Sequence, residues 1–198
     1  MMDRLDHLLD AASPLLDRVD RVLSTVGAPE GHPVWTELRR VRLLPGDAAR
    51  AVGALYPEAI RDAVPELRAN VRAYAAVADA LPLAGAWEGE AADAYERARR
   101  RTAENLNGGP DSLSRRMEAT ADLADALTSW MARSRGDLAA MLAAALVSVE
   151  AVALTTETLP PDEEARLAAA VATPLLRTVA DSYDRGETLL NHSATLQN

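Results

Sequence analysis

The chain has 198 residues, a formal net charge of −9 and no cysteine. Alanine and leucine dominate, phenylalanine is absent, and β-branched residues form no alternating run, so the composition predicts an all-α protein. The lack of cysteine excludes a disulfide framework and a thiolate metal site, and the negative charge argues against binding to nucleic acid.

Residues suited to catalysis or metal binding are scarce. Every cation is arginine, so the chain has no lysine for a Walker-type phosphate loop or a Schiff base. Its three histidines, His7, His32 and His192, lie in unrelated contexts without metal-ligand spacing. We therefore expect no enzyme activity, no bound cofactor and no metal.

The first 26 residues predict an amphipathic helix with a kink at Pro14. Acidic and basic residues fill the gaps between its apolar positions, which excludes the apolar core of a signal peptide. The apolar positions recur at intervals of four and three: Leu5, Leu8, Ala12, Leu15, Val19, Val22 and Val26.

Glycine and proline break the chain repeatedly after this helix. The loop at 27–31 precedes a short helix that starts at Pro33 or Val34. Asp47 is expected to cap a second short helix. Residues 1–64 are therefore predicted to form a helical extension that packs on the rest, because a lone amphipathic helix is marginal in water.

Two apolar stripes then flank a short break, and this arrangement predicts an antiparallel helical hairpin. Pro82 and Gly85 end the first helix. The first stripe consists of Leu67, Val71, Tyr74, Ala78 and Leu81, and the second of Ala91, Tyr95, Ala98, Thr102 and Leu106.

Trp87 stands where the hairpin opens, and Gly89 follows where the chain re-enters the helix. The spacing of Trp87, Gly89 and the aromatic Tyr95 resembles the WXG family of small helical-hairpin proteins, which type VII (ESX) secretion systems export. The resemblance covers roughly residues 65–131. The alternative is that Trp87 merely plugs the end of a hairpin.

The second arm of the hairpin is expected to be long. After a break at 107–110, where the helix of the WXG family usually continues, a helix is predicted over 111–157 with a bend at Gly136. This places a WXG-like hairpin domain at 65–157. Residues 138–154 are apolar on nearly every side, which leaves two interpretations: a buried or interface helix, or a segment that inserts conditionally into a membrane.

The last segment, 158–198, predicts one helix with a proline and three carboxylates in its first turn and a kink at Pro174. Its inward positions are expected to be Leu167, Val171, Leu175, Val179 and Tyr183. Tyr183 and Glu187 have the spacing Tyr-x-x-x-Asp/Glu, which resembles the C-terminal export signal of type VII substrates.

The resemblance implies an elongated antiparallel helical bundle built around a WXG-type hairpin. Such a protein would be a non-enzymatic substrate or accessory of the secretion system, and it would reach the cell surface or medium without a cleavable signal peptide. The expected partners are a second copy or another helical WXG-like protein, together with the secretion ATPase. The alternatives are a cytosolic scaffold or adaptor, and a pore-forming protein acting through 138–154.

Overall fold

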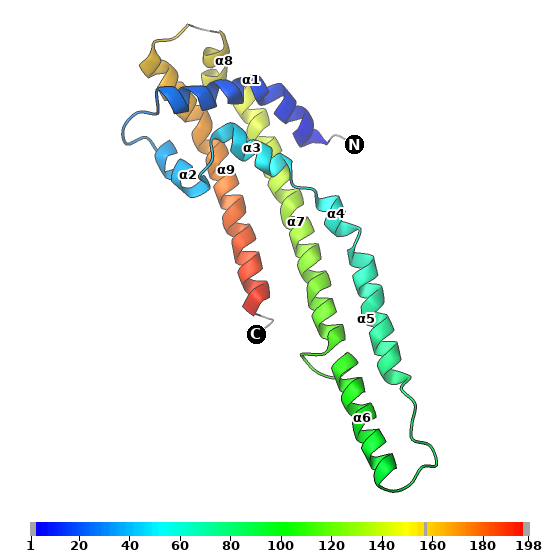
Figure 1. Ribbon diagram of the computed structural model, residues 1–198. Helices are drawn as coiled ribbons and strands as arrows, with labels where there is room; N and C mark the ends of the chain where they lie inside the picture. Colours follow the sequence, from blue (N-terminus) through cyan, green and yellow to red (C-terminus); the bar gives the residue numbers. More distant parts are fainter. Residues whose placement is uncertain (1–2, 157, 196–198) are drawn as a thin grey trace. The chain divides into compact units, whose positions relative to one another are not determined.

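The computed structural model describes residues 3–156 and 158–195 (Figure 1). This part of the chain contains helices and no strand, which confirms the prediction of an all-α helical bundle. The helices are α1 (Arg4–Thr25), α2 (Val34–Val41), α3 (Pro45–Gly53), α4 (Pro57–Arg61), α5 (Val64–Asp79), α6 (Glu90–Asn107), α7 (Leu113–Leu146), α8 (Val149–Thr156) and α9 (Pro161–Thr195).

The described chain forms two compact units. Unit 1 combines the residues up to Tyr56 with those of 129–188, and unit 2 combines 57–128 with the residues after Thr188. These bounds differ from the three consecutive segments expected from the sequence, which were expected to form one compact domain together. Breaks in a sequence mark where helices end, but they do not show which helices pack together.

Unit 1 has a core of leucine, valine and alanine. The predicted inner positions of α1 and α9 are buried or half-buried, except for the last position of each stripe. These two residues, Val26 and Tyr183, are exposed. Both helices continue through their internal prolines, Pro14 and Pro174. Burying each large aliphatic side chain contributes roughly 1.5–3 kcal/mol. The fully buried ones include Leu5, Leu16, Val19, Leu138, Leu142, Leu154, Leu175, Leu176 and Val179.

A carboxylate of α1 caps the start of α3. Asp20 Oδ1 accepts a hydrogen bond from the Gly46 amide at 2.9 Å, and a Cβ on Gly46 would lie 2.5 Å from Asp20 Oδ2. Burial raises the pKa of Asp20. The predicted cap, Asp47, is wrong: α3 begins two residues earlier at Pro45, and Asp47 instead accepts a bond from Arg50 at 3.0 Å.

Arg135 of α7 joins three parts of unit 1. Its side chain is only 11% exposed, and its Nε and Nη2 donate to Asp3 Oδ2 at 3.0 and 2.7 Å. Nη2 also donates to Asp6 Oδ1 at 2.8 Å. Nη1 donates to the carbonyls of Gly53 and Leu55. A single guanidinium thus holds the start of α1 and the end of α3 against α7.

The long helix predicted after the hairpin is broken at a different place from the one expected. α7 runs without a break through Gly136, the residue at which a bend was predicted. The break lies at 147–148, where Ser148 Oγ accepts from the amide of Ala151 at 3.1 Å and caps α8. One glycine costs a helix about 1 kcal/mol, which does not suffice to interrupt it. Glu157, the predicted end, lies outside the described residues.

The apolar segment 138–154 contributes to the core of unit 1 through Leu138, Leu142 and Leu154. In the described part of the chain, no single helix is long and apolar enough to span a membrane. By length and composition, α7 and α8 meet that requirement only as a pair, with a bend of 63° between them.

The carboxyls that hold Arg135 give unit 1 a dependence on pH. Burial would raise the pKa of Asp3, but hydrogen bonds from Arg135 and from the amides of Asp6 and Leu5 outweigh it and lower that pKa. The bond from the Asp3 amide and the bond from Arg135 lower the pKa of Asp6. Such groups stabilise the fold above their ordinary pKa of 3.8 and lose that contribution as pH falls through the lowered value.

The substitution Arg135→Gln is expected to lower the free energy of unfolding by about 2 kcal/mol at about pH 7, mainly because two backbone carbonyls lose a charged donor. The ion pairs add less, since both carboxylates are partly exposed. Urea unfolding measures the change. The exposed neighbour Arg133→Gln is the control and should change stability little. The difference in free energy of unfolding between the wild type and Arg135→Gln should become smaller as the pH falls to about 3. If it does not, Arg135 does not lower the pKa of the two carboxyls.

Candidate functional site

The predicted hairpin is present in unit 2, where α5 and α6 lie side by side (Figure 1). The inner face of α5 is the predicted one, buried or half-buried at each expected position. The prediction of the inner face of α6 is wrong by about one residue, because Ala91, Ala98 and Thr102 are exposed. The positions that are buried or half-buried include Ala92, Tyr95, Arg99, Ala103 and Leu106.

Arg99 explains part of this rotation. Its side chain is mostly covered, and its guanidinium donates two hydrogen bonds to Glu96, at 2.7 and 2.8 Å. Arginine can cover a helix face with its apolar stem while its head stays paired, so a packed position need not be apolar. Arg100 adds a third bond at 3.0 Å, and the bonds from Arg99 and Arg100 lower the pKa of Glu96 to about 2.

The reversal between α5 and α6 is held by backbone conformation and by one tyrosine. Gly85 and Gly89 have φ of +64° and +87°, a region that favours glycine, and Gly89 is the residue from which α6 starts. The Tyr95 hydroxyl donates to the carbonyl oxygen of Pro82 at 2.8 Å. This bond ties the first turns of α6 to the connection that follows α5.

Trp87 lies in this reversal with its ring against Tyr95, at a centroid distance of 5.6 Å and an interplanar angle of 57°. Its side chain is 62% exposed. A residue that plugged the end of the hairpin would be buried between the helices. The indole therefore covers the outside of the corner and presents most of its surface to solvent.

Tyr183 and Glu187 lie one helical turn apart on the exposed side of α9 in unit 1. The prediction that Tyr183 points inward is wrong, because it is 39% exposed. The inner positions are Ser182, whose carbonyl accepts from Trp130 Nε1 at 2.8 Å, and Gly186. A Cβ on Gly186 would lie 2.9 Å from the Trp130 ring, so close packing on this indole fixes the rotation of α9.

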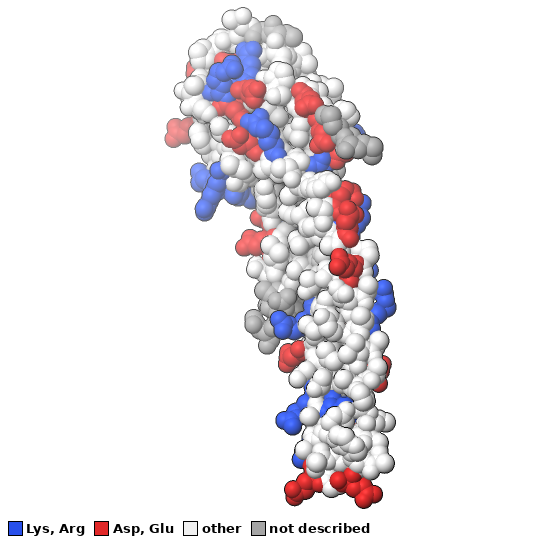
Figure 2. All heavy atoms as spheres, turned by 45° about the vertical axis from the view of Figure 1, so that its right-hand side comes forward, with Lys and Arg blue, Asp and Glu red and all other residues white. Residues whose placement is uncertain are grey.

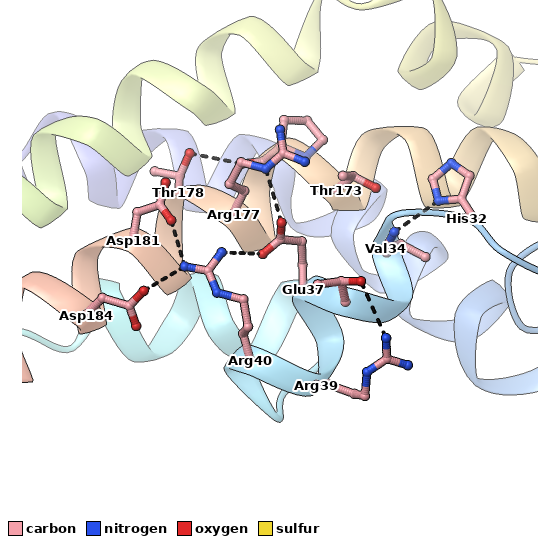
Figure 3. A network of polar contacts seen from close by, with 12 residues as sticks. His32, Val34, Glu37, Arg39, Arg40, Thr173, Arg177, Thr178, Asp181 and Asp184 are labelled. Carbon is pink, nitrogen blue, oxygen red and sulfur yellow. Dashed lines mark hydrogen bonds and ion pairs between the residues drawn. The ribbon is translucent and has the colours of Figure 1, made fainter.

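A charged cluster between α2 and α9 was not predicted from the sequence (Figure 3). Glu37 is only 5% exposed and accepts bonds from Arg40 Nη1 at 2.7 Å and Arg177 Nε at 3.1 Å. Arg40 Nη2 also donates to Asp181 at 2.8 Å and Asp184 at 2.7 Å. These bonds, first that to Asp181, raise the pKa of Arg40. Each member is paired, so the cluster acts as a clamp between two helices.

The face shown in Figure 2 has no continuous basic patch of described residues to which a polyanion could bind. Acidic and basic side chains intermingle over the face shown in Figure 2. Among the residues that the structure describes, no group of three or more His, Asp or Glu side chains is placed to hold a metal ion.

Comparison of the chain with protein-family models, curated proteins and solved structures gives no match. The features of the structure that bear on function are the hairpin corner, the exposed face of α9 and the charged clamp. Trp87 and Gly89 belong to unit 2, whereas Tyr183 and Glu187 belong to unit 1.

Replacing Gly89 with alanine is expected to destabilise the fold by about 1 kcal/mol, because φ of +87° is unfavourable for a residue with a Cβ. No atom lies within 4 Å of the added methyl group, so the cost is conformational. Thermal unfolding followed by circular dichroism measures it.

The matched control is Gly136→Ala, which also meets no atom within 4 Å but lies inside α7. It should stabilise the protein by about 0.5–1 kcal/mol, because alanine favours a helix. Equal effects of the two substitutions would show that the conformation at Gly89 does not matter.

Proposed function

We propose that this chain is a WXG-like substrate or accessory protein of a type VII secretion system, and that it acts by association of helices without catalysis. The observation that carries the proposal is the corner at Trp87. A Trp-x-Gly tripeptide occupies the reversal between two packed helices, with the indole 62% exposed and the glycine at φ +87°. That is the position which the family resemblance assigns to this tripeptide.

The exposed face of α9 supports the same proposal. An export signal must be accessible to its receptor while the protein is folded. Tyr183 and Glu187 share one face of the helix and are both exposed. The packing of Ser182 and Gly186 on Trp130 holds them on that face.

Association with a helical partner is the expected mode of action. At the corner of unit 2, Leu83 and Trp87 are both large, apolar and mostly exposed. Both belong to the short connection between α5 and α6, so a partner that packs on this connection would bury apolar surface. We propose a second copy or a smaller WXG-like helical protein as the partner, and the secretion ATPase as the receptor.

A cytosolic scaffold or adaptor is the alternative, and one observation favours it. The Tyr95–Pro82 hydrogen bond and the Trp87–Tyr95 ring contact both stabilise the hairpin itself. They give the two aromatic residues a structural role that requires no secretion system. Insertion into a membrane is less favoured, because leaving unit 1 would remove Leu138 and Leu154 from its core.

A measurement of export distinguishes the secretion substrate from the cytosolic scaffold. Replacing Tyr183 with alanine is expected to reduce the amount of protein in the culture medium by about tenfold or more, the loss for removing a principal contact of a receptor. Helicity should stay unchanged, because Tyr183 is not part of the core. Immunoblots of medium and cell lysate, with circular dichroism of the purified variant, measure both quantities.

Tyr56→Ala is the matched control, since Tyr56 is also an exposed tyrosine but lies far from Tyr183 in the sequence. It should be exported like the wild type. If Tyr183→Ala is exported normally, α9 does not carry the signal. If the wild type stays in the cytosol with stable partners, the scaffold alternative holds.

A further inference from the structure

The connection between α6 and α7 in unit 2 begins with a pair of residues that is chemically unstable in water (Figure 1). Asn107 is the last residue of α6, and Gly108 follows it. Asn107 is the one asparagine of the sequence that precedes a glycine. The asparagines at 70, 105 and 191 precede valine, leucine and histidine.

An asparagine side chain can react with the backbone of the residue that follows it. The backbone nitrogen loses its proton and attacks Cγ of the side chain, so that a C–N bond forms and the Cγ–Nδ2 bond breaks. The side-chain nitrogen leaves as ammonia, and a cyclic imide remains. Water then adds to one of the ring carbonyls and opens the ring, which leaves aspartate or isoaspartate. The reaction needs no oxidant or reductant, and a glycine favours it because no Cβ obstructs the attacking nitrogen.

The surroundings of Asn107 leave its side chain free to react. The residue is exposed, and its side-chain amide makes no hydrogen bond with another described residue. Gly108 is exposed as well, and no atom lies within 4 Å of a Cβ added at Gly109. The backbone can therefore turn at this point without displacing a neighbouring side chain.

One backbone hydrogen bond opposes the reaction. The Gly108 amide donates to the carbonyl oxygen of Glu104 at 2.8 Å and closes the last turn of α6. This bond must open before the nitrogen can turn toward Cγ of Asn107. The terminal turns of helices open at a far lower cost than the fold as a whole. Opening of the end of α6, and not unfolding of unit 2, therefore limits the reaction.

The products of the reaction do not fit the closed turn. A carboxylate at position 107 adds negative charge at the C-terminal end of α6, where the helix dipole is already negative. It also lies one helical turn from the carboxylate of Glu104. Isoaspartate lengthens the main chain, which then passes through Cβ and Cγ, yet a Cβ on Gly108 would already lie 2.5 Å from Glu104 Cα. The modified chain therefore cannot close the last turn of α6 again.

We propose that Asn107 is a site of spontaneous deamidation, and that this modification opens the junction of α6 and α7 in unit 2 as the protein ages. Three observations carry the proposal: the Asn-Gly pair, its place at the exposed end of a helix, and the close approach of Gly108 to Glu104. The site is independent of the proposed export, because it involves neither Trp87 nor Tyr183.

The test is prolonged incubation of the full-length protein at mildly alkaline pH, followed by peptide mass spectrometry with fragmentation that distinguishes isoaspartate from aspartate. We expect Asn107 to lose most of its side-chain amide, with isoaspartate as the larger product. Asn105 is the internal control and should keep its amide, because it is exposed on the same helix but precedes leucine. Equal loss at both residues, aspartate as the sole product, or an intact Asn107 under conditions that convert a synthetic peptide of residues 103–112, would overturn the proposal.

Two substitutions connect the modification to the opening of the junction. Asn107→Gln should keep its melting temperature on incubation, because ring closure through the longer side chain is slow and glutamine favours a helix. Asn107→Asp should lower the melting temperature of fresh protein by about 1–3 °C, since the carboxylate opposes the helix dipole. The wild type should lose more than this once it is fully modified, because isoaspartate also lengthens the chain. An equal or smaller loss would contradict the opening of the junction.

Discussion

The closed reversal between α5 and α6 is the constraint on which the functional proposal depends. It combines a backbone conformation that suits glycine at Gly89 with a hydrogen bond from Tyr95 to Pro82. Each contributes only about 1 kcal/mol to the stability of the fold. Together they fix the register in which α6 returns along α5. Trp87 therefore stays on the outside of the corner, where its indole can contact a partner.

Unit 1 depends on polar contacts between segments far apart in the chain. Arg135 binds carboxylates 132 and 129 residues away, and Arg177 binds Glu37 across 140 residues. The apolar core supplies most of the stabilisation, but alanine-rich faces fit one another in several registers. The charged contacts select one register, because a buried arginine or glutamate without its partner would be costly.

Much of the fold follows from the sequence, and the exceptions have physical causes. The inner face of α5 was predictable because Leu67 and Val71 stand between polar residues and Tyr74 is a large side chain between alanines. The face of α6 was not, since alanine occurs on all its sides and Arg99 packs through its stem. Gly136 does not interrupt α7, because one glycine costs a helix only about 1 kcal/mol. Ser148, the residue that caps α8, resembles any other serine until its neighbours are known.

Some residues of the candidate sites could be predicted from the sequence and others could not. Trp87 and Gly89 were recognisable because their meaning is local: a reversal needs a break, a glycine and a residue at the corner. The pairing of Arg40 with Asp181 and Asp184 was invisible because no local pattern links α2 to α9.

Recognition by the secretion system, which we propose for this chain, is measured by comparing two strains that differ only in the secretion ATPase. The fraction of the protein in the medium is measured in each, with a cytosolic protein as the control for lysis. We expect the protein to reach the medium only when the ATPase is present. Equal amounts in both media, or retention in the cytosol of both strains, would contradict it.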